Sequence, residues 1–133
     1  MFSIGRLELL TSFKGKVTES IYFGNTPLGR RLDAYFEGVL TGGVLSGKMR
    51  GVDYILVRSD GIAEINVRAA IITSDGVNIS VQISGFGQGE EIKDTYVKMV
   101  TGHKDYRWLS SLIIIGKGKS TSDNLEIDYF YEP

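Results

Sequence analysis

Residues 62–73 lie between two identical Ser-Asp-Gly tripeptides and alternate in polarity. One row of alternate residues is apolar throughout: Ala63, Ile65, Val67, Ala69 and Ile71. The other row begins with Glu64, Asn66 and Arg68 and ends with Ala70 and Ile72. A period of two places successive side chains on opposite faces of a strand, and Asp-Gly pairs tolerate the backbone angles of tight turns. The segment is therefore predicted to be a β-strand with a turn at each end.

The same alternation recurs along the whole chain, in short runs that end at glycine-containing turns. These runs predict about ten strands, near residues 6–13, 16–23, 32–40, 44–50, 53–58, 62–73, 77–86, 95–101, 106–116 and 123–132. Connections this short require antiparallel neighbours, and closing such a sheet removes its unpaired edges. We therefore predict one all-β domain over residues 1–133, an antiparallel up-and-down β-barrel of about 8–10 strands.

Residues 90–101 allow two interpretations. Ile92, Tyr96 and Met99 could share one face of a helix that ends at Gly102. The same stretch also alternates as a strand, with Tyr96 and Val100 on one face and Met99 on the other. The strand is the preferred interpretation.

Composition excludes several classes of function. The chain has 15 Lys plus Arg against 16 Asp plus Glu, a formal net charge of -1, with no block of one sign. Neither nucleic acid nor a membrane surface is therefore an expected partner. The absence of cysteine removes disulfides and thiolate chemistry and suits a cytoplasmic protein, and no stretch is long and apolar enough to span a membrane as a helix.

An ordered set of motifs resembles the DUF3237 family, also labelled UPF0311. The matching positions are Thr26, Pro27, Gly29 and Arg31; Asp53 and Tyr54; Arg58, Asp60 and Gly61; Ile65 to Ala69; Asp75 and Gly76; and Tyr106, Trp108, Leu109 and Ser110. The resemblance covers about three-quarters of the chain. It implies a compact barrel of calycin or lipocalin shape, but it implies no settled activity.

The chain departs from the family pattern where chemistry would matter most. Asn66 stands where the pattern has Asp, Ala69 where it has Tyr, and Tyr54 where it has Trp. An asparagine still forms hydrogen bonds but cannot take up a proton. The substitution favours ligand binding over proton transfer, unless Glu64 supplies the missing base.

The polar row of the bracketed strand has two interpretations. It is a solvated outer face, or it is the wall of a ligand cavity that changes from a charged mouth to an apolar floor at Ala70 and Ile72. In the second case Arg68 would hold an acidic or phenolic group of the ligand, beside Asn66 and Glu64.

Other candidate site residues also have structural alternatives. Tyr54 and Trp108 are candidate aromatic walls, although large aromatic residues in β-proteins usually belong to the core. Arg58 and Asp60 form a turn-stabilising pair at a strand end, and Asp53 begins a strand; either position could rim a cavity mouth.

The sequence favours a barrel that binds a small apolar or aromatic molecule carrying an acidic or phenolic group. The alternative is a cofactor-independent decarboxylase, isomerase or cyclase acting on such a molecule, with Glu64 as a candidate for the catalytic base. We expect no metal, because the single His103 has no further ligands at suitable spacing, and no cofactor. A homodimer is a further expectation, because both faces of residues 106–116 are apolar.

Overall fold

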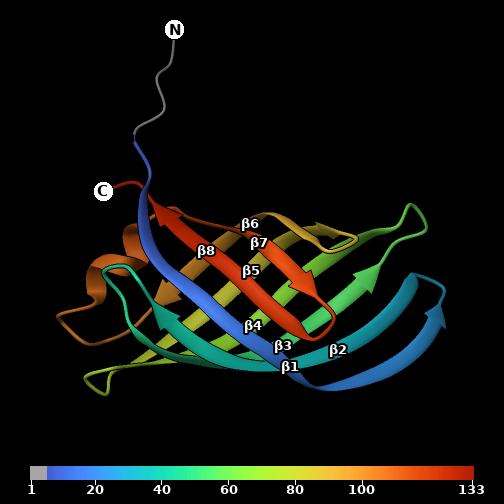
Figure 1. Cartoon of the computed structure of the whole chain (residues 1–133), viewed down its shortest axis with the longest axis horizontal. Helices are drawn as coiled ribbons and strands as arrows, with labels where there is room; N and C mark the ends of the chain where they lie inside the picture. The colour runs from blue at the N-terminus through green and yellow to red at the C-terminus, as the bar shows by residue number, and fades with distance from the viewer. Residues whose placement is uncertain (1–5) are drawn as a thin grey trace, which may run out of the picture.

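The computed structural model describes residues 6–133, which form a closed barrel of eight strands (Figure 1). The strands are β1 (Glu8–Thr26), β2 (Gly29–Thr41), β3 (Gly47–Val57), β4 (Ile62–Thr73), β5 (Asn78–Gln88), β6 (Glu91–Val100), β7 (Ile114–Thr121) and β8 (Asn124–Tyr131). A 3₁₀ helix, η1 (Arg107–Ser111), lies between β6 and β7. No helix within residues 6–133 is both long and apolar enough to cross a membrane.

Every strand pairs antiparallel with the next strand along the chain, and β8 pairs with β1 to close the sheet. The predicted all-β, up-and-down barrel is confirmed, with a strand count at the lower limit of the expected range. Residues 91–100 form the preferred strand and not the alternative helix. The bracketed segment 62–73 is β4, with the bounds that its two turns predict.

Two predicted turns are wrong, which is why the chain has fewer strands than its glycines suggest. Gly15 lies inside β1, opposite Gly38 of β2. Gly51 likewise lies inside β3, opposite Ala69 of β4. At both positions a Cβ atom would collide with the neighbouring strand, so the glycine permits close strand approach instead of forming a turn.

The predicted strand 106–116 is also wrong over residues 106–113, because β7 begins only at Ile114. The hydroxyls of Ser110 and Ser111 donate to the carbonyl oxygens of Arg107 and Trp108, each three residues earlier. Such local hydrogen bonds compete with a β-ladder and stabilise the short helix η1. Leu109 is 1% exposed, because η1 inserts this side chain into the end of the barrel.

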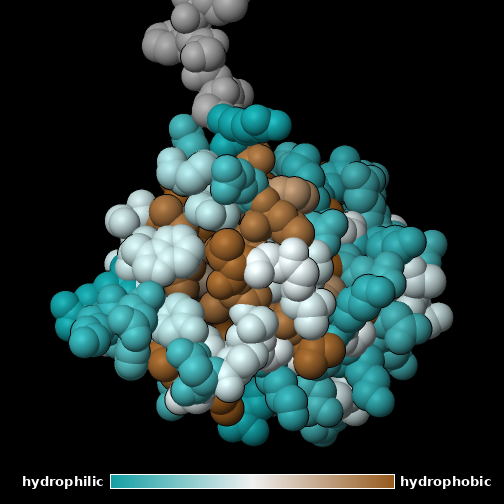
Figure 2. All heavy atoms as spheres, turned by 60° about the vertical axis from the view of Figure 1, so that its left-hand side comes forward, coloured by the Kyte–Doolittle hydropathy of each residue, from teal (hydrophilic) through white to brown (hydrophobic). Residues whose placement is uncertain are grey.

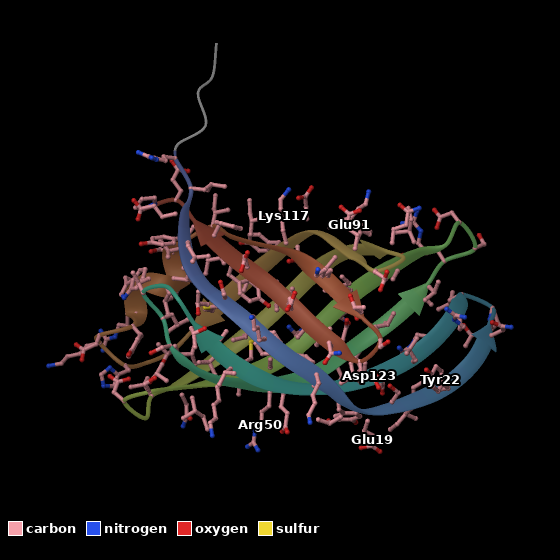
Figure 3. The ribbon with its side chains drawn as sticks, in the orientation of Figure 1. Glu19, Tyr22, Arg50, Glu91, Lys117 and Asp123 are labelled. Carbon is pink, nitrogen blue, oxygen red and sulfur yellow. The ribbon has the colours of Figure 1, made fainter. Side chains whose placement is uncertain are left out.

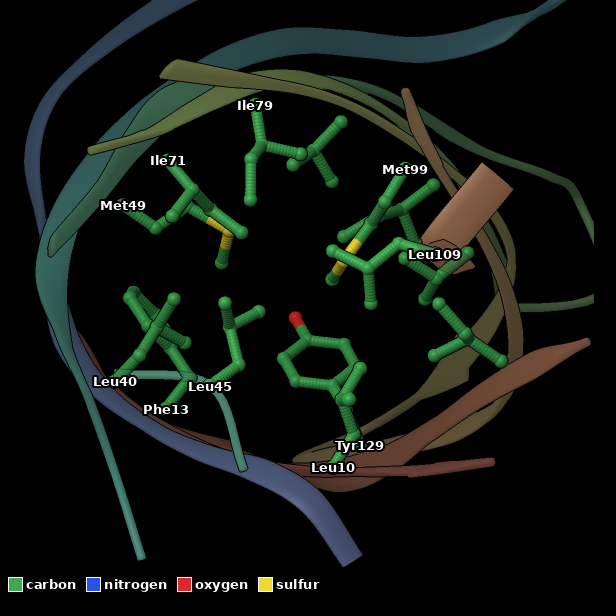
Figure 4. Close-up of a cluster of buried hydrophobic side chains, with 14 of the residues drawn as sticks. Leu10, Phe13, Leu40, Leu45, Met49, Ile71, Ile79, Met99, Leu109 and Tyr129 are labelled. Atoms are coloured by element: carbon green, nitrogen blue, oxygen red, sulfur yellow. The ribbon is translucent and has the colours of Figure 1, made fainter. Parts of the chain in front are cut away.

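Large side chains fill the end of the barrel where η1 lies, which we call the closed end (Figure 4). The residues in this tightly packed half are Leu10, Leu40, Leu45, Met49, Ile71, Ile79, Met99, Leu109 and Ile114. Figure 2 brings this end forward and shows apolar side chains over part of its surface. Turns β1–β2, β3–β4, β5–β6 and β7–β8 surround the opposite end, which we call the open end.

Replacing Gly38 with alanine tests the close approach of β1 and β2. The new methyl group would collide with the Lys14 carbonyl oxygen and the Gly15 Cα, which are backbone atoms that cannot move independently. We expect Gly38→Ala to lower the free energy of unfolding by about 2–3 kcal/mol in urea denaturation. Gly102→Ala is the control, because no atom lies within 4 Å of a Cβ at that position. Equal stability of the two variants would contradict the packing described here.

Candidate functional site

The open half of the barrel contains a cavity of about 170 Å³. Its residues come from all eight strands and from the β5–β6 turn. They include Phe13, Val17, Ala34, Phe36, Asp53, Ile55, Ala63, Ile65, Val67, Gly87, Glu90, Glu91, Ile92, Thr95, Ser120, Leu125, Ile127 and Tyr129. A cavity of roughly 150 Å³ lined by apolar side chains is sufficient to bind benzene. The space in this barrel therefore suits a molecule with one aromatic ring.

The cavity lies where small inward residues from several strands meet. On β4 the inward row runs from Ile71, which is fully buried in the closed half, to Ala63 beside the cavity. Ala34 and Gly87 contribute similarly small surfaces from β2 and β5. An eight-stranded barrel is just wide enough for side chains to fill, so small residues at one level leave room for a ligand.

Asp53 places a carboxyl group in this mostly apolar wall. The β3–β4 ladder is interrupted beside it, since pairing runs to Asp53 opposite Val67 and resumes at Leu56 opposite Glu64. Within the interruption the Asn66 N–H donates to Asp53 Oδ1 at 3.0 Å. The carboxylate thus satisfies a backbone donor that the ladder leaves without a strand partner.

Burial raises the pKa of Asp53 from an ordinary 3.8 to about 6. Two smaller effects act in the opposite direction, the hydrogen bond from the Asn66 N–H and the positive charge of Arg31. Arg31 is held near β3 by its Nη1, which donates to the Ile55 carbonyl oxygen at 2.7 Å, and by an ion pair with Asp33 at 2.8 Å. A carboxyl group with this pKa exchanges its proton close to neutral pH.

The polar row of β4 lies on the outer face of the barrel. Asn66 and Arg68 are exposed and Glu64 is partly exposed, while the apolar row from Ala63 to Ile71 faces inward. Figure 3 shows the same arrangement on other strands, where Arg50 and Lys117 point away from the barrel. The structure selects the solvated-face interpretation, because the apolar row gains more from burial than a charged row.

The remaining candidate residues also lie away from the cavity. Tyr54 is 39% exposed on the outer face of β3, and Trp108 is 40% exposed at the closed end, 5.9 Å from the Tyr131 ring. Arg58 forms an ion pair with Asp60 in the β3–β4 turn, as the structural alternative predicts. None of Glu64, Asn66, Arg68, Tyr54, Trp108 and Arg58 is among the described residues that line the cavity. Placing these side chains in the lumen is therefore incorrect, and any binding role on the outer surface stays a prediction.

The cavity residues that the sequence did not indicate include Tyr129, Thr95 and the pair Glu90 and Glu91. Asp53 was only one of two candidates for the rim. A signal for Asp53 is present in the sequence, because it shares the parity of Met49 and Ile55, which face inward. Across residues 6–133, no group of three or more His, Cys, Asp or Glu side chains is arranged to hold a metal ion.

The fold and the cavity place the chain among small, closed antiparallel β-barrels. The family model described as "Protein of unknown function (DUF3237)" matches residues 6–95, more than half of the sequence, so the chain belongs to this family. A UPF0311 protein of Bradyrhizobium diazoefficiens is 26% identical over an alignment of 133 residues, covering 85% of this chain and 87% of that protein. The resemblance predicted from the motifs is confirmed.

Two solved structures share this fold. A protein of unknown function from Clostridium acetobutylicum has a TM-score of 0.88 and 21% identity, with 100% of each chain covered. An enzyme from Penicillium herquei has a TM-score of 0.77 and 21% identity, with 100% of this chain and 98% of that chain covered. At these identities the likeness establishes the shared fold.

Replacing Asp53 with asparagine tests its burial. Between about pH 4 and pH 6 the folded protein keeps the Asp53 proton while the unfolded chain has lost it, so this group makes stability fall as pH rises. Asparagine cannot ionise, and its side-chain carbonyl oxygen can still accept a hydrogen bond from the Asn66 N–H. We expect Asp53→Asn to gain stability relative to wild type through this window, reaching about 2 kcal/mol at pH 7 after allowing for water near the carboxyl.

Asp75→Asn is a control for which the expected change in stability at neutral pH has the opposite sign. Hydrogen bonds from the hydroxyls of Thr73 and Tyr106 lower the pKa of Asp75, so its contribution to stability is present at neutral pH and lost in acid. This variant should be less stable than wild type at pH 7 and approach it at low pH. Denaturation curves that show no gain for Asp53→Asn between pH 4 and pH 7 would place Asp53 in water.

Proposed function

We propose that the open-end cavity binds a small neutral molecule with one aromatic ring and a hydroxyl group, which donates a hydrogen bond to Asp53. The observation that carries this proposal is the position of Asp53, an ionisable side chain with a raised pKa in a mostly apolar wall. Ligand sites in proteins typically combine an apolar lining with a few polar groups that fix orientation. The volume of about 170 Å³ limits the ligand to about one ring.

The charge of the lining argues against an anionic ligand. Asp53, Glu90 and Glu91 line the cavity, and none of its described lining residues is a lysine or an arginine. A ligand carboxylate would therefore meet only like charge, and its desolvation would have no compensating partner. A neutral phenolic hydroxyl fits better, because it donates to a carboxylate without bringing a charge. The proposal thus keeps the expected phenolic group but assigns its recognition to Asp53 instead of Arg68.

A second candidate function is a cofactor-independent enzyme acting on the same kind of molecule. It is favoured by the Asp53 pKa of about 6, which suits a group that accepts and returns a proton near neutral pH. The barrel from Penicillium herquei, which shares this fold, is described as an enzyme. In this candidate Asp53 takes the role of base that the sequence offered to Glu64, since Glu64 lies on the outer surface.

Blocking the cavity tests the binding site that both candidate functions share, with phenol as the probe. Ala63 lines the cavity, and Ala70 lies on the outer face of the same strand. We expect Ala63→Phe to weaken phenol binding at least about tenfold, because the larger side chain occupies the space for one ring. Ala70→Phe should leave the affinity unchanged, and so should Arg68→Ala. The measurement is the phenol-induced shift of amide signals in NMR spectra of the labelled protein.

The location of the shifts is as informative as the affinity. Amides near Asp53, Ile65 and Thr95 should respond, because these residues line the cavity. Shifts confined to the outer row around Arg68, or loss of binding in Arg68→Ala alone, would contradict the proposed site.

A further inference from the structure

Tyr129 lies on the inner face of β8 and is 1% exposed. Its ring packs against Gly116 of the neighbouring strand β7, with which it is paired. A Cβ atom at Gly116 would stand 2.8 Å from the Tyr129 Cε1, so the ring occupies space that any other residue at position 116 would fill. The absence of a side chain at Gly116 therefore leaves the space that the Tyr129 ring occupies.

The Tyr129 hydroxyl has no hydrogen-bond partner among residues 6–133, and Figure 4 shows it pointing toward the middle of the barrel. The described residues contain no fully enclosed side-chain oxygen or nitrogen without a partner. The hydroxyl therefore keeps contact with open space, and Tyr129 is one of the residues that line the cavity. The nearby Thr95 differs, because its hydroxyl donates to the Gly116 carbonyl oxygen at 2.9 Å.

An unpaired hydroxyl in an apolar interior requires a physical reason, since removing it from water has a free-energy cost. Phenylalanine would fill the same space without that cost. Burial raises the pKa of Tyr129, so the hydroxyl stays neutral and remains a hydrogen-bond donor at physiological pH. A ligand in the cavity would meet this donor on one wall and Asp53 on another, since β3 and β8 are separated by β1 and β2.

We propose that Tyr129 donates a hydrogen bond to a carbonyl oxygen of the ligand, which makes the ligand a hydroxylated aromatic aldehyde or ketone. This inference rests on the proposed function, in which Asp53 accepts a hydrogen bond from the hydroxyl group of the same molecule. The two groups divide the polar recognition between them, with an acceptor on β3 and a donor on β8. Tyr129 is thus a residue that determines specificity at the site.

The test compares phenol with 4-hydroxybenzaldehyde, which adds a carbonyl group. Wild type should bind the aldehyde more tightly than phenol, and Tyr129→Phe should lose this preference, so that the ratio of the two affinities falls about 3–10-fold. Tyr96→Phe is the matched control, because Tyr96 is 49% exposed on the outer surface. It should keep the wild-type preference. Retention of that preference in Tyr129→Phe overturns the assignment.

A spectroscopic measurement on wild type supports the test if the variant folds poorly. The carbonyl stretch of bound 4-hydroxybenzaldehyde should appear at lower frequency than in hexane, because a hydrogen bond weakens the C=O bond. A frequency equal to that in hexane overturns the inference.

The outcomes separate the two proposals. If neither probe binds wild type, the proposed function fails, and the Tyr129 inference fails with it. If both probes bind and Ala63→Phe blocks them while Tyr129→Phe keeps the preference for the aldehyde, the cavity function stands and only the role of Tyr129 is overturned.

Discussion

Closure of the sheet is the constraint on which the rest of the structure depends. When β8 pairs with β1, the number of strands sets the width of the interior, and only the size of the inward side chains can then vary. Leucine, isoleucine and methionine side chains fill one half and exclude ligands from it. In the other half the inward residues include Ala34, Ala63 and Gly87. These small residues do not fill the interior, and the remaining space is the cavity.

The site chemistry follows from the same constraint. A polar side chain on the inner face loses its water, so each one must find a partner or contact the cavity. Asp53 does both, since it accepts the Asn66 N–H and keeps a surface toward the cavity. The Tyr129 hydroxyl has no hydrogen-bond partner among residues 6–133 and Tyr129 lines the cavity, which makes the two side chains complementary as acceptor and donor. Two polar groups of opposite hydrogen-bonding type can orient a ligand in this mostly apolar cavity.

Much of the fold could be predicted from the sequence, because period-two alternation and turn chemistry act locally. The bounds of β4 are correct for this reason. Gly15, Gly51 and the segment 106–116 could not be predicted in the same way. A glycine that allows two strands to approach looks like a glycine in a turn, and an apolar segment that plugs a barrel resembles a buried strand.

The candidate site was harder to predict, because the face that a strand turns inward depends on its neighbours. The polarity of the charged row of β4 suggests a site, yet the cavity is lined by the apolar row of the same strand. Asn66 contributes through its backbone N–H, a group that every residue except proline supplies, so its side chain gave no information about the site. Asp53 could be found only by following the inward parity of β3 from Met49.

The most direct test of this account is the pKa of Asp53 itself, measured from the ¹³C chemical shift of its carboxyl carbon as pH changes. A carboxyl group in the apolar cavity should titrate near pH 6. Saturating phenol should move the midpoint, because the bound hydroxyl donates to the ionised form and favours it. An Asp53 titration midpoint near pH 4 that does not change when phenol is added would show a solvated carboxyl group and contradict the account.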